Sequence, residues 1–286
     1  MRIVLDAMGS DAYPEPEVQA AVEAGRLFGD EVILVGHQDQ LWPRLKALAS
    51  EHPPVKVIHA PEVLEMGDKP ATSARHKAEN SMAIGMDLLK TGAADAFVTA
   101  GNTGGAMANA LFRLGRIRGV KRPALTALFP VKTGYCVVLD IGANADCKPE
   151  YLVQFAIMGS VYAEKVMGVK NPRVALLSNG EEPGKGNELV KETFPLIKET
   201  GLNFIGNVEG KELFGGGTDV AVMDGFTGNI LLKSSEAVGK LITEKLREEL
   251  MGSFQTKIGG MLARPAFAHQ KDAGSRRSRR SPTPRY

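Results

Sequence analysis

Short runs of apolar, mostly β-branched residues recur along the chain, and longer segments with apolar residues at helical spacing separate most of them. The short runs predict strands over residues 2–6, 31–36, 55–60, 95–101, 135–142, 173–180, 203–208 and 219–225. The longer segments include predicted helices over residues 16–29, 73–90, 149–168 and 229–250. Apolar strands that alternate with amphipathic helices are typical of parallel sheets covered on both faces. The pattern therefore predicts an α/β fold whose mostly parallel sheet has helices on both faces.

One segment departs from this alternation. Within residues 123–140, two apolar runs meet at a Lys-Thr-Gly turn, which favours an antiparallel hairpin added to the parallel strands. No linker-like stretch divides the rest, so we expect residues 1–267 to form a single α/β domain in two lobes.

Glycine-rich polar loops follow five of the predicted strands. They cover residues 6–11, 100–105, 140–150, 179–188 and 224–229. Two of them, AGNTGGAM and DGFTGNIL, are near copies that share a strand, the pattern x-G-x-T-G and then a helix. Ligands of α/β sheets bind beyond the carboxyl ends of the strands, and helix N-termini there favour anions. One such loop is more often a structural turn, but five on one expected sheet edge indicate a binding site.

The same loops exclude the common nucleotide-binding motifs. None contains the G-K-[ST] ending of a Walker A loop, and none reads G-x-G-x-x-G after the first strand. The loops are therefore better suited to a small anion than to a nucleotide.

Composition narrows the class of protein further. The chain is 43% hydrophobic and 24% charged and has no apolar run of 18 residues, so we expect a cytosolic protein without a transmembrane segment. The N-terminus, MRIVLDAMGSD, opens on a strand and does not resemble a signal peptide. Two cysteines and five histidines show no metal-binding spacing, which predicts no metal site. Residues 269–286 hold six Lys/Arg and one Asp, so the net charge of +2 belongs to the end of the chain.

Several longer motifs resemble one known family in sequence and in order. They include VLDAMGSD, TAGNTGGAM, LDIGANADCKPEY, LLSNGEEPGKGNE and DVAVMDGFTGN, and they extend from residue 1 to about residue 267. The family is that of the PlsX phosphate acyltransferases, acyl-ACP:phosphate acyltransferases. The resemblance implies a fold similar to phosphotransacetylases and isopropylmalate-type dehydrogenases, and a homodimer.

The same resemblance implies a reaction and a set of partners. An acyl chain would pass from acyl carrier protein to inorganic phosphate, and the acyl phosphate would feed bacterial phospholipid synthesis through a membrane glycerol-phosphate acyltransferase. The enzyme would be cytoplasmic, associate peripherally with the membrane surface, use no cofactor and bind no nucleic acid.

This chemistry suggests which residues to consider. Phosphate is already ionised, so the site has to orient it and stabilise charge rather than supply a Ser or Cys nucleophile. We expect catalytic roles for Lys77, Asn102 and Lys185. Phosphate or substrate binding is expected from Asn102, Thr103, Gly104, Gly105, Asn144, Asp146, Asn187, Thr227 and Asn229. Lys77 as a solvated surface residue and Asp146 as a helix cap are equally open alternatives.

The end of the chain combines apolar and basic residues. Phe254, Ile258, Met261 and Leu262 recur at helical spacing, which suits contact with a membrane surface. Packing in a dimer is the alternative. Residues 268–286 depart from the family and are predicted to be a basic, disordered tail.

Two other functions remain open at this stage. The phosphate site alone does not identify the acyl donor, so a short-chain phosphate acyltransferase that uses acyl-CoA is one alternative. An inactive scaffold that binds carrier protein or membrane is the other, because the C-terminal residues differ from the family pattern.

Overall fold

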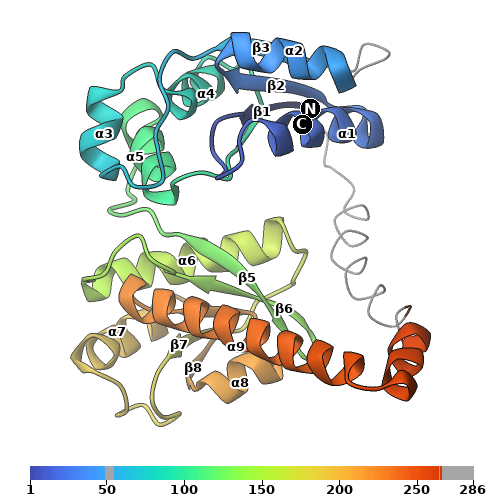
Figure 1. The fold of residues 1–286 in the computed structure, drawn as a ribbon. Coiled ribbons are helices and arrows are strands. Elements are labelled where there is room, and N and C mark those ends of the chain that lie inside the picture. Colours follow the sequence, from blue (N-terminus) through green and yellow to red (C-terminus); the bar gives the residue numbers. More distant parts are fainter. Residues whose placement is uncertain (49–54, 264, 266–286) are drawn as a thin grey trace. The chain divides into compact units, whose positions relative to one another are not determined.

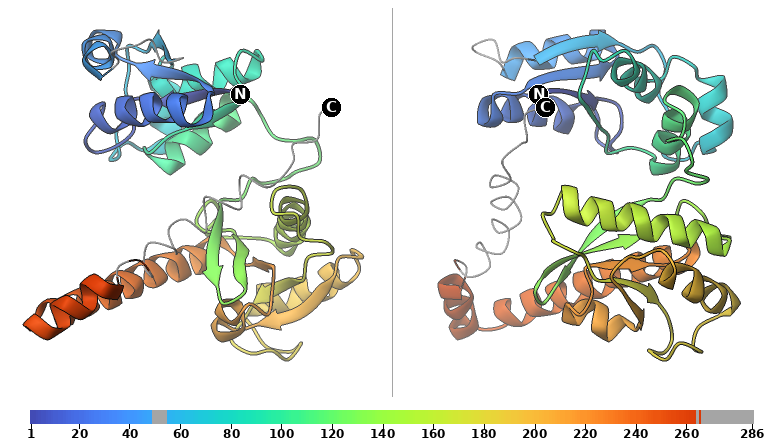
Figure 2. Two further views of the ribbon diagram at one scale, coloured as in Figure 1. Left: turned by 90° about the vertical axis from the view of Figure 1, so that its right-hand side faces the viewer. Right: turned by 180° about the vertical axis from the view of Figure 1, so that it is seen from behind.

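The computed structural model describes residues 1–48, 55–263 and 265, and it contains two compact units (Figure 1). The first comprises Met1–Gly119 and the second begins at Val120. Figure 2 shows the ribbon from two further sides.

The first unit is built on a parallel sheet. Its strands are β1 (Arg2–Asp6), β2 (Glu31–Gly36), β3 (Val55–His59) and β4 (Ala96–Val98), in the order β3-β2-β1-β4. Alternate residues of β2 face opposite sides: Val32 and Leu34 pack with α1 (Glu15–Phe28) and α2 (Gln38–Leu48). Ile33 and Val35 pack with α4 (Ser81–Lys90) instead. The sheet is thus covered on both faces, as the sequence predicts.

The helix predicted over residues 73–90 is wrong in one respect, because it is two helices. α3 (Pro70–His76) ends before Lys77, and α4 begins at Ser81. The cause is Asn80, a fully buried N-cap whose Oδ1 accepts from the Ala83 N–H at 2.9 Å and whose Nδ2 donates to the Lys77 carbonyl at 2.6 Å. α5 (Thr103–Arg113) completes the unit.

The second unit is built on a mixed sheet. Its strands are β5 (Thr126–Val131), β6 (Gly134–Leu139), β7 (Val174–Leu177), β8 (Phe204–Val208) and β9 (Val220–Val222), in the order β5-β6-β9-β7-β8. The β5–β6 pair is antiparallel and the other pairs are parallel, which confirms the predicted hairpin.

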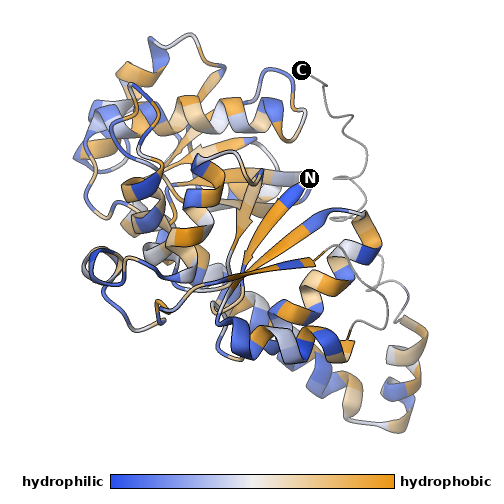
Figure 3. Cartoon of the chain, turned by 90° about the horizontal axis from the view of Figure 1, so that it is seen from above, coloured by the Kyte–Doolittle hydropathy of each residue, from blue (hydrophilic) through white to orange (hydrophobic). Residues whose placement is uncertain are grey.

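Helices cover both faces of this second sheet as well. α6 (Pro149–Lys165) and α7 (Glu188–Lys198) pack on one face around Leu139 and Val222. α8 (Gly210–Gly215) and the first turns of α9 (Gly225–Met251) pack on the other face around Val138 and Ala221. Figure 3 shows the result as strands that are mostly orange and helices that alternate between orange and blue.

The two sheets correct the expectation that all five glycine-rich loops share one edge. The loops after β1 and β4 leave the first sheet, whereas those after β6, β7 and β9 leave the second. β4 pairs with β1, while β6 pairs with β5 and β9. The spacing of strands along a chain does not show which strands pair, so the sequence alone did not predict two sheets.

α9 begins four residues earlier than predicted and is followed by a helical stretch over residues 254–263. Phe254, Met261 and Leu262 are more than 70% exposed, and Ile258 is 44% exposed. In the part of the chain that the structure describes, no helix is long and apolar enough to cross a bilayer. The tail predicted over residues 268–286 lies outside the described residues.

Candidate functional site

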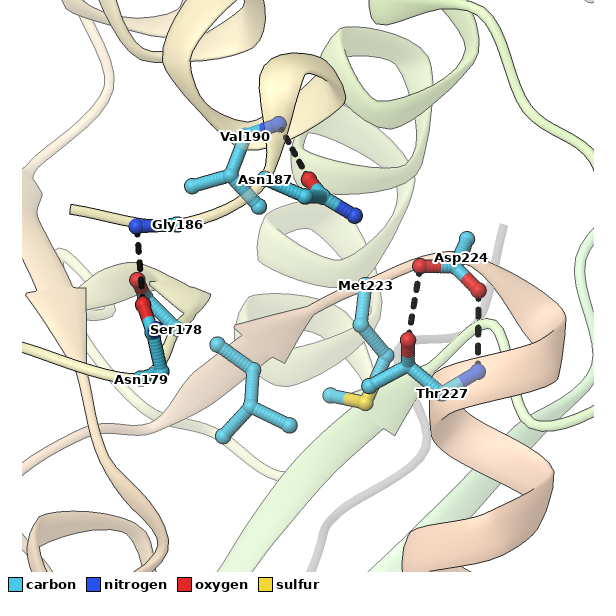
Figure 4. A pocket seen from close by; sticks show the side chains of 9 residues that line it. Ser178, Asn179, Gly186, Asn187, Val190, Met223, Asp224 and Thr227 are labelled. Atoms are coloured by element: carbon cyan, nitrogen blue, oxygen red, sulfur yellow. Dashed lines mark hydrogen bonds between the residues drawn. The ribbon is translucent and has the colours of Figure 1, made fainter.

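Two adjoining cavities lie at the carboxyl ends of β6, β9 and β7 in the second unit. The serine cavity, of about 370 Å³, is lined by Leu177, Ser178, Asn179, Gly186, Asn187, Val190, Met223, Asp224 and Thr227 (Figure 4). The cysteine cavity, of about 360 Å³, is lined by Ala145, Asp146, Cys147, Asn187, Leu189, Asp224, Phe226 and Thr227. Asn187, Asp224 and Thr227 belong to both walls, so the two spaces share one boundary.

The start of α9 forms one side of that boundary. Asp224 is the N-cap, and its Oδ1 accepts from the Thr227 N–H at 2.8 Å. The Thr227 hydroxyl donates to the other carboxylate oxygen at 2.8 Å, which holds both side chains in place (Figure 4). A Cβ on Gly228 would lie 1.9 Å from the Asp140 carbonyl oxygen, so this helix approaches the loop after β6 as closely as glycine allows.

The start of α7 forms the other side. Asn187 is the N-cap, and its Oδ1 accepts from the Val190 N–H at 3.0 Å. In Figure 4 its amide nitrogen points away from α7 and toward the side of the cavity where Asp224 lies. The amide is therefore available to a bound molecule at the shared boundary.

The two helix starts bring two positive helix ends to the cysteine cavity, beside the carboxylates of Asp146 and Asp224. The second residues of α7 and α9, Leu189 and Phe226, both line it. The first N–H groups of a helix have no partner within the helix and carry its positive end. Two such ends around one space favour a bound anion.

The loop after β6 is held by a buried carboxylate. Asp140 accepts from the N–H groups of Leu125, Gly142, Ala143 and Asn144 and from the Asn144 side chain, at 2.8–3.1 Å. The Asn144 amide also donates to the Pro123 carbonyl at 2.8 Å. Asn144 thus fixes the loop, whereas Asp146 is exposed and lines the cysteine cavity.

Cys147 also lines the cysteine cavity, but its thiol is a poor nucleophile at neutral pH. Its thiol donates to the Asn144 carbonyl at 3.4 Å, and burial raises the pKa of the thiol to about 11. A thiol with this pKa is protonated at neutral pH, and the neutral thiol is a poor nucleophile.

Two other predicted residues lie near the cavities without lining either one. Lys185 is exposed, and its side chain lies against the Cα of Gly180. Asn229 is exposed in the first turn of α9 and lies over Gly142.

The remaining predicted residues belong to the first unit, where Asn102 has a full set of partners. As the N-cap of α5 it accepts from the Gly105 N–H at 2.9 Å. Its Nδ2 lies 3.1–3.3 Å from the carbonyl oxygens of Glu65, Met66 and Asp68. The Asn102 side chain therefore ties the 65–68 segment to α5.

Lys77 holds the same segment from the other side. Its Nζ donates to Asp68 Oδ2 at 2.6 Å and to the Val63 carbonyl at 2.8 Å, and the ammonium group lowers the pKa of the Asp68 carboxyl. The glycines of α5 are covered as well, because Cβ atoms on Gly104 and Gly105 would lie 2.6 Å from Pro70 and Leu64. Thr103 is exposed. The predicted site residues thus fall into two groups, one in each unit.

Comparison with known proteins decides the family. Residues 1–276 match the family described as "Fatty acid synthesis protein". Over 272 residues the chain is 48% identical to the phosphate acyltransferase of Elusimicrobium minutum, which covers 95% of this chain and 80% of the relative. It is 49% identical to the phosphate acyltransferase of Acidobacterium capsulatum over 266 residues, or 93% and 79% of the two chains. The chain belongs to the PlsX family of phosphate acyltransferases.

Solved structures confirm the fold class of this phosphate acyltransferase. The EutD phosphotransacetylase from Staphylococcus aureus aligns with a TM-score of 0.60 at 19% identity, covering 84% of this chain and 82% of that one. A phosphotransacetylase from Streptococcus pyogenes aligns with a TM-score of 0.66 at 18% identity and the same coverage. The resemblance predicted a phosphotransacetylase-like fold, and this is confirmed.

Sequence reasoning missed several residues of the acyltransferase's cavities, among them the polar residues Ser178, Asn179 and Asp224. Asp224 could have been found, because an Asp three residues before Thr227 in DGFTGN has the spacing of a helix N-cap and the third helical residue, whose N–H donates to it. Ser178 follows directly on β7 but has no pattern around it that separates it from an ordinary loop serine.

Proposed function

We propose that this phosphate acyltransferase makes acyl phosphate from acyl-[acyl carrier protein] and inorganic phosphate, for bacterial phospholipid synthesis. Membership of the family supports acyl transfer to phosphate. The observation that carries the proposal is the pair of cavities with a shared wall of Asn187, Asp224 and Thr227. A reaction between two separate substrates needs two adjacent spaces that meet at one boundary.

Phosphate is assigned to the cysteine cavity. The positive ends of α7 and α9 and the Asn187 amide attract and orient the anion. Thr227, whose N–H and hydroxyl both donate to Asp224, keeps that carboxylate in place beside it. Asp146 and Asp224 oppose this binding by charge, although two donors from Thr227 already satisfy Asp224.

The transfer itself needs no covalent enzyme intermediate. A phosphate oxygen attacks the thioester carbonyl carbon, the new C–O bond gives a tetrahedral oxyanion, and its collapse breaks the C–S bond and releases the carrier thiolate. Donors fixed around the reacting atoms stabilise the oxyanion. The protonated Cys147 does not compete with phosphate for the acyl group, because only a thiolate would be an effective acceptor.

Roles in phosphate binding for the first-unit residues remain predictions. Asn102 and Lys77 already have protein partners within residues 62–70, so we assign them first to holding this segment: Asn102 ties it to α5, and Lys77 ties it to the end of α3. Asn144 is assigned in the same way to the loop after β6. Asp146, Asn229 and the Gly104 N–H group are left as predicted binding groups, and Lys185 as a predicted catalytic group. The predicted Gly105 N–H donates to Asn102 instead, and the predicted Thr103 is exposed at the start of α5.

The end of the described chain supports the proposed membrane contact. Phe254, Met261 and Leu262 are largely exposed on the helical stretch after α9, and exposed apolar side chains of this kind suit an interfacial helix. The proposal also includes a homodimer that is cytoplasmic and associates peripherally with the membrane surface. Its proposed partner there is a membrane glycerol-phosphate acyltransferase.

The deciding experiment incubates the purified protein with phosphate and each of three acyl donors: palmitoyl-carrier protein, palmitoyl-CoA and acetyl-CoA. Acyl phosphate is trapped with hydroxylamine and measured as the hydroxamate. We expect product from palmitoyl-carrier protein at the highest kcat/KM. Product from acetyl-CoA alone would replace the proposal with a short-chain enzyme, and binding of carrier protein without product from any donor would favour a scaffold.

A further inference from the structure

Ser178 has a hydroxyl group for which the fold provides no partner. Its backbone N–H extends the sheet by donating to the Val208 carbonyl at 2.9 Å. Its Oγ is buried, lies in the wall of the serine cavity and has no hydrogen-bond partner among the described residues. A Cβ placed on Gly186 would be only 3.1 Å from this oxygen, so the hydroxyl is closely surrounded on that side.

The neighbouring polar groups of the cavity differ from Ser178 in this respect. Asn179 Oδ1 accepts from the Gly186 N–H, Asn187 Oδ1 accepts from the Val190 N–H, and the Thr227 hydroxyl donates to Asp224 (Figure 4). A buried polar group without a partner lowers the stability of the fold. Three other buried side-chain oxygens of the described residues lack partners, those of Ser10, Glu17 and Asn207, but none of them lines either cavity.

We propose that the serine cavity holds the thioester end of the acyl donor, and that the Ser178 hydroxyl donates a hydrogen bond to a carbonyl oxygen of that donor. This inference rests on the proposed function and assigns the second substrate within it. A neutral carbonyl suits a single hydroxyl donor, because the carbonyl oxygen replaces its hydrogen bond to water with an equivalent bond to the Ser178 hydroxyl.

The walls of the two cavities support this division of the substrates. Leu177, Val190 and Met223 give the serine cavity an apolar side, which suits a neutral acyl thioester better than an anion. The N-caps and third residues of α7 and α9 line the serine cavity too, but their second residues, Leu189 and Phe226, line only the cysteine cavity. The thioester carbon and the phosphate then meet at the boundary formed by Asn187 and Thr227.

The test compares Ser178→Ala with Ser235→Ala. Ser235 in α9 is also half-buried, but its hydroxyl donates to the Leu231 carbonyl at 2.7 Å and lines neither cavity. We expect Ser178→Ala to raise the KM for the acyl donor about tenfold, which corresponds to one lost hydrogen bond. Its KM for phosphate should change less than twofold, and Ser235→Ala should change neither KM.

Thermal unfolding separates binding from a structural role. Because Ser178→Ala removes an unsatisfied buried group, its Tm should equal or exceed that of the wild type. A lower Tm with both KM values unchanged would show a structural hydroxyl and overturn the proposal. Unchanged Tm and KM values, or a raised KM for phosphate alone, would overturn it as well. Ser178→Cys, whose thiol is somewhat larger and only a weak donor, provides the same KM comparison if the alanine variant fails to fold.

A binding measurement keeps this inference separate from the identity of the donor. In the absence of phosphate, the acyl donor that the wild type accepts should raise the Tm of the wild type more than that of Ser178→Ala. If the enzyme proves to use acyl-CoA, the proposed carrier-protein substrate is wrong, but the same comparison with acyl-CoA still decides the role of Ser178. An equal rise in Tm for both proteins would contradict the inference.

Discussion

The two most similar stretches of this sequence begin two helices in different ways. AGNTGGAM and DGFTGNIL align residue by residue, so Thr103 corresponds to Thr227 and Gly104 to Gly228. In the first stretch the N-cap is Asn102, and Thr103 is the first helical residue. In the second the N-cap is Asp224, and Thr227 is the third helical residue. The helix starts two positions earlier in the second stretch, so corresponding residues have different tasks.

The surroundings of the two helix starts differ as much as their registers. Around α5, the 62–70 segment is held by Asn102 and Lys77 and packs on the glycines. Around α9, the glycines pack on the loop after β6, and Phe226 and Thr227 face the cavities. The motif therefore specifies a capped helix start. Whether that start is covered or lines a cavity depends on which other segment of the protein packs against it.

The largest expected difference is between Gly228→Ala and Gly104→Ala. The new Cβ at position 228 would meet a backbone oxygen at 1.9 Å, which requires the helix or the loop to move, and should cost about 3 kcal/mol or more. At position 104 it would meet the Pro70 ring at 2.6 Å, and the better helix propensity of alanine offsets part of a cost of about 1 kcal/mol. Urea denaturation followed by circular dichroism measures both, and equal losses would show that the two starts are packed alike.

The second comparison is between Asn102→Ala and Asn102→Ser. Alanine removes the helix cap and the contacts with the 65–68 carbonyls, so the free energy of unfolding should fall by about 2 kcal/mol. Serine keeps a capping oxygen and should recover about half of that loss. Hydrogen exchange of the 62–70 segment should be faster in both variants. An alanine variant of wild-type stability with a raised KM for phosphate would instead return Asn102 to the phosphate site.

Much of the fold could be predicted from the sequence because burial leaves a periodic pattern. The continuous apolar runs of β1 and β2 and the hairpin at residues 132–134 were read correctly for that reason. The break at Asn80 was missed because the residue caps a helix inside an otherwise helical pattern. The division into two sheets was missed because strand pairing depends on contacts between distant residues, such as Val137 with Val220.

The candidate site was less predictable than the fold. A polar side chain in a glycine-rich loop can either bind a ligand or hold the loop in place, and the local sequence does not distinguish these two roles. All four of Asn102, Asn144, Asn187 and Thr227 have protein partners, but only Asn187 and Thr227 also line cavities, although the four looked equivalent in the sequence. The Ser178 hydroxyl lacks a hydrogen-bond partner because of the residues that surround it in the fold, and no local sequence pattern predicts this.

The third comparison is between Thr227→Val and Thr103→Val, two corresponding threonines. Valine at 227 removes the hydroxyl that orients Asp224 and faces both cavities, so kcat/KM for phosphate should fall about tenfold. Thr103 is exposed at the start of α5, and its replacement should change kcat/KM less than twofold. Steady-state kinetics with saturating acyl donor measures both. Equal losses would place the two helix starts around the same phosphate.

The smallest effect on activity is expected from Cys147→Ser, because the thiol beside α9 is protonated and takes no chemical step. The pKa of about 11, compared with an ordinary value of 9.0, predicts that alkylation by iodoacetamide at pH 8 is about 100-fold slower than for a free thiol. The rate should rise about tenfold per pH unit until the pH approaches 11, since only the thiolate reacts. Peptide mapping separates this reaction from that of Cys136, whose pKa is raised to about 12 by burial and which serves as an internal control. A rate for Cys147 that levels off near pH 9, together with a large loss of activity in Cys147→Ser, would mean that the cavity beside α9 contains a reactive thiolate.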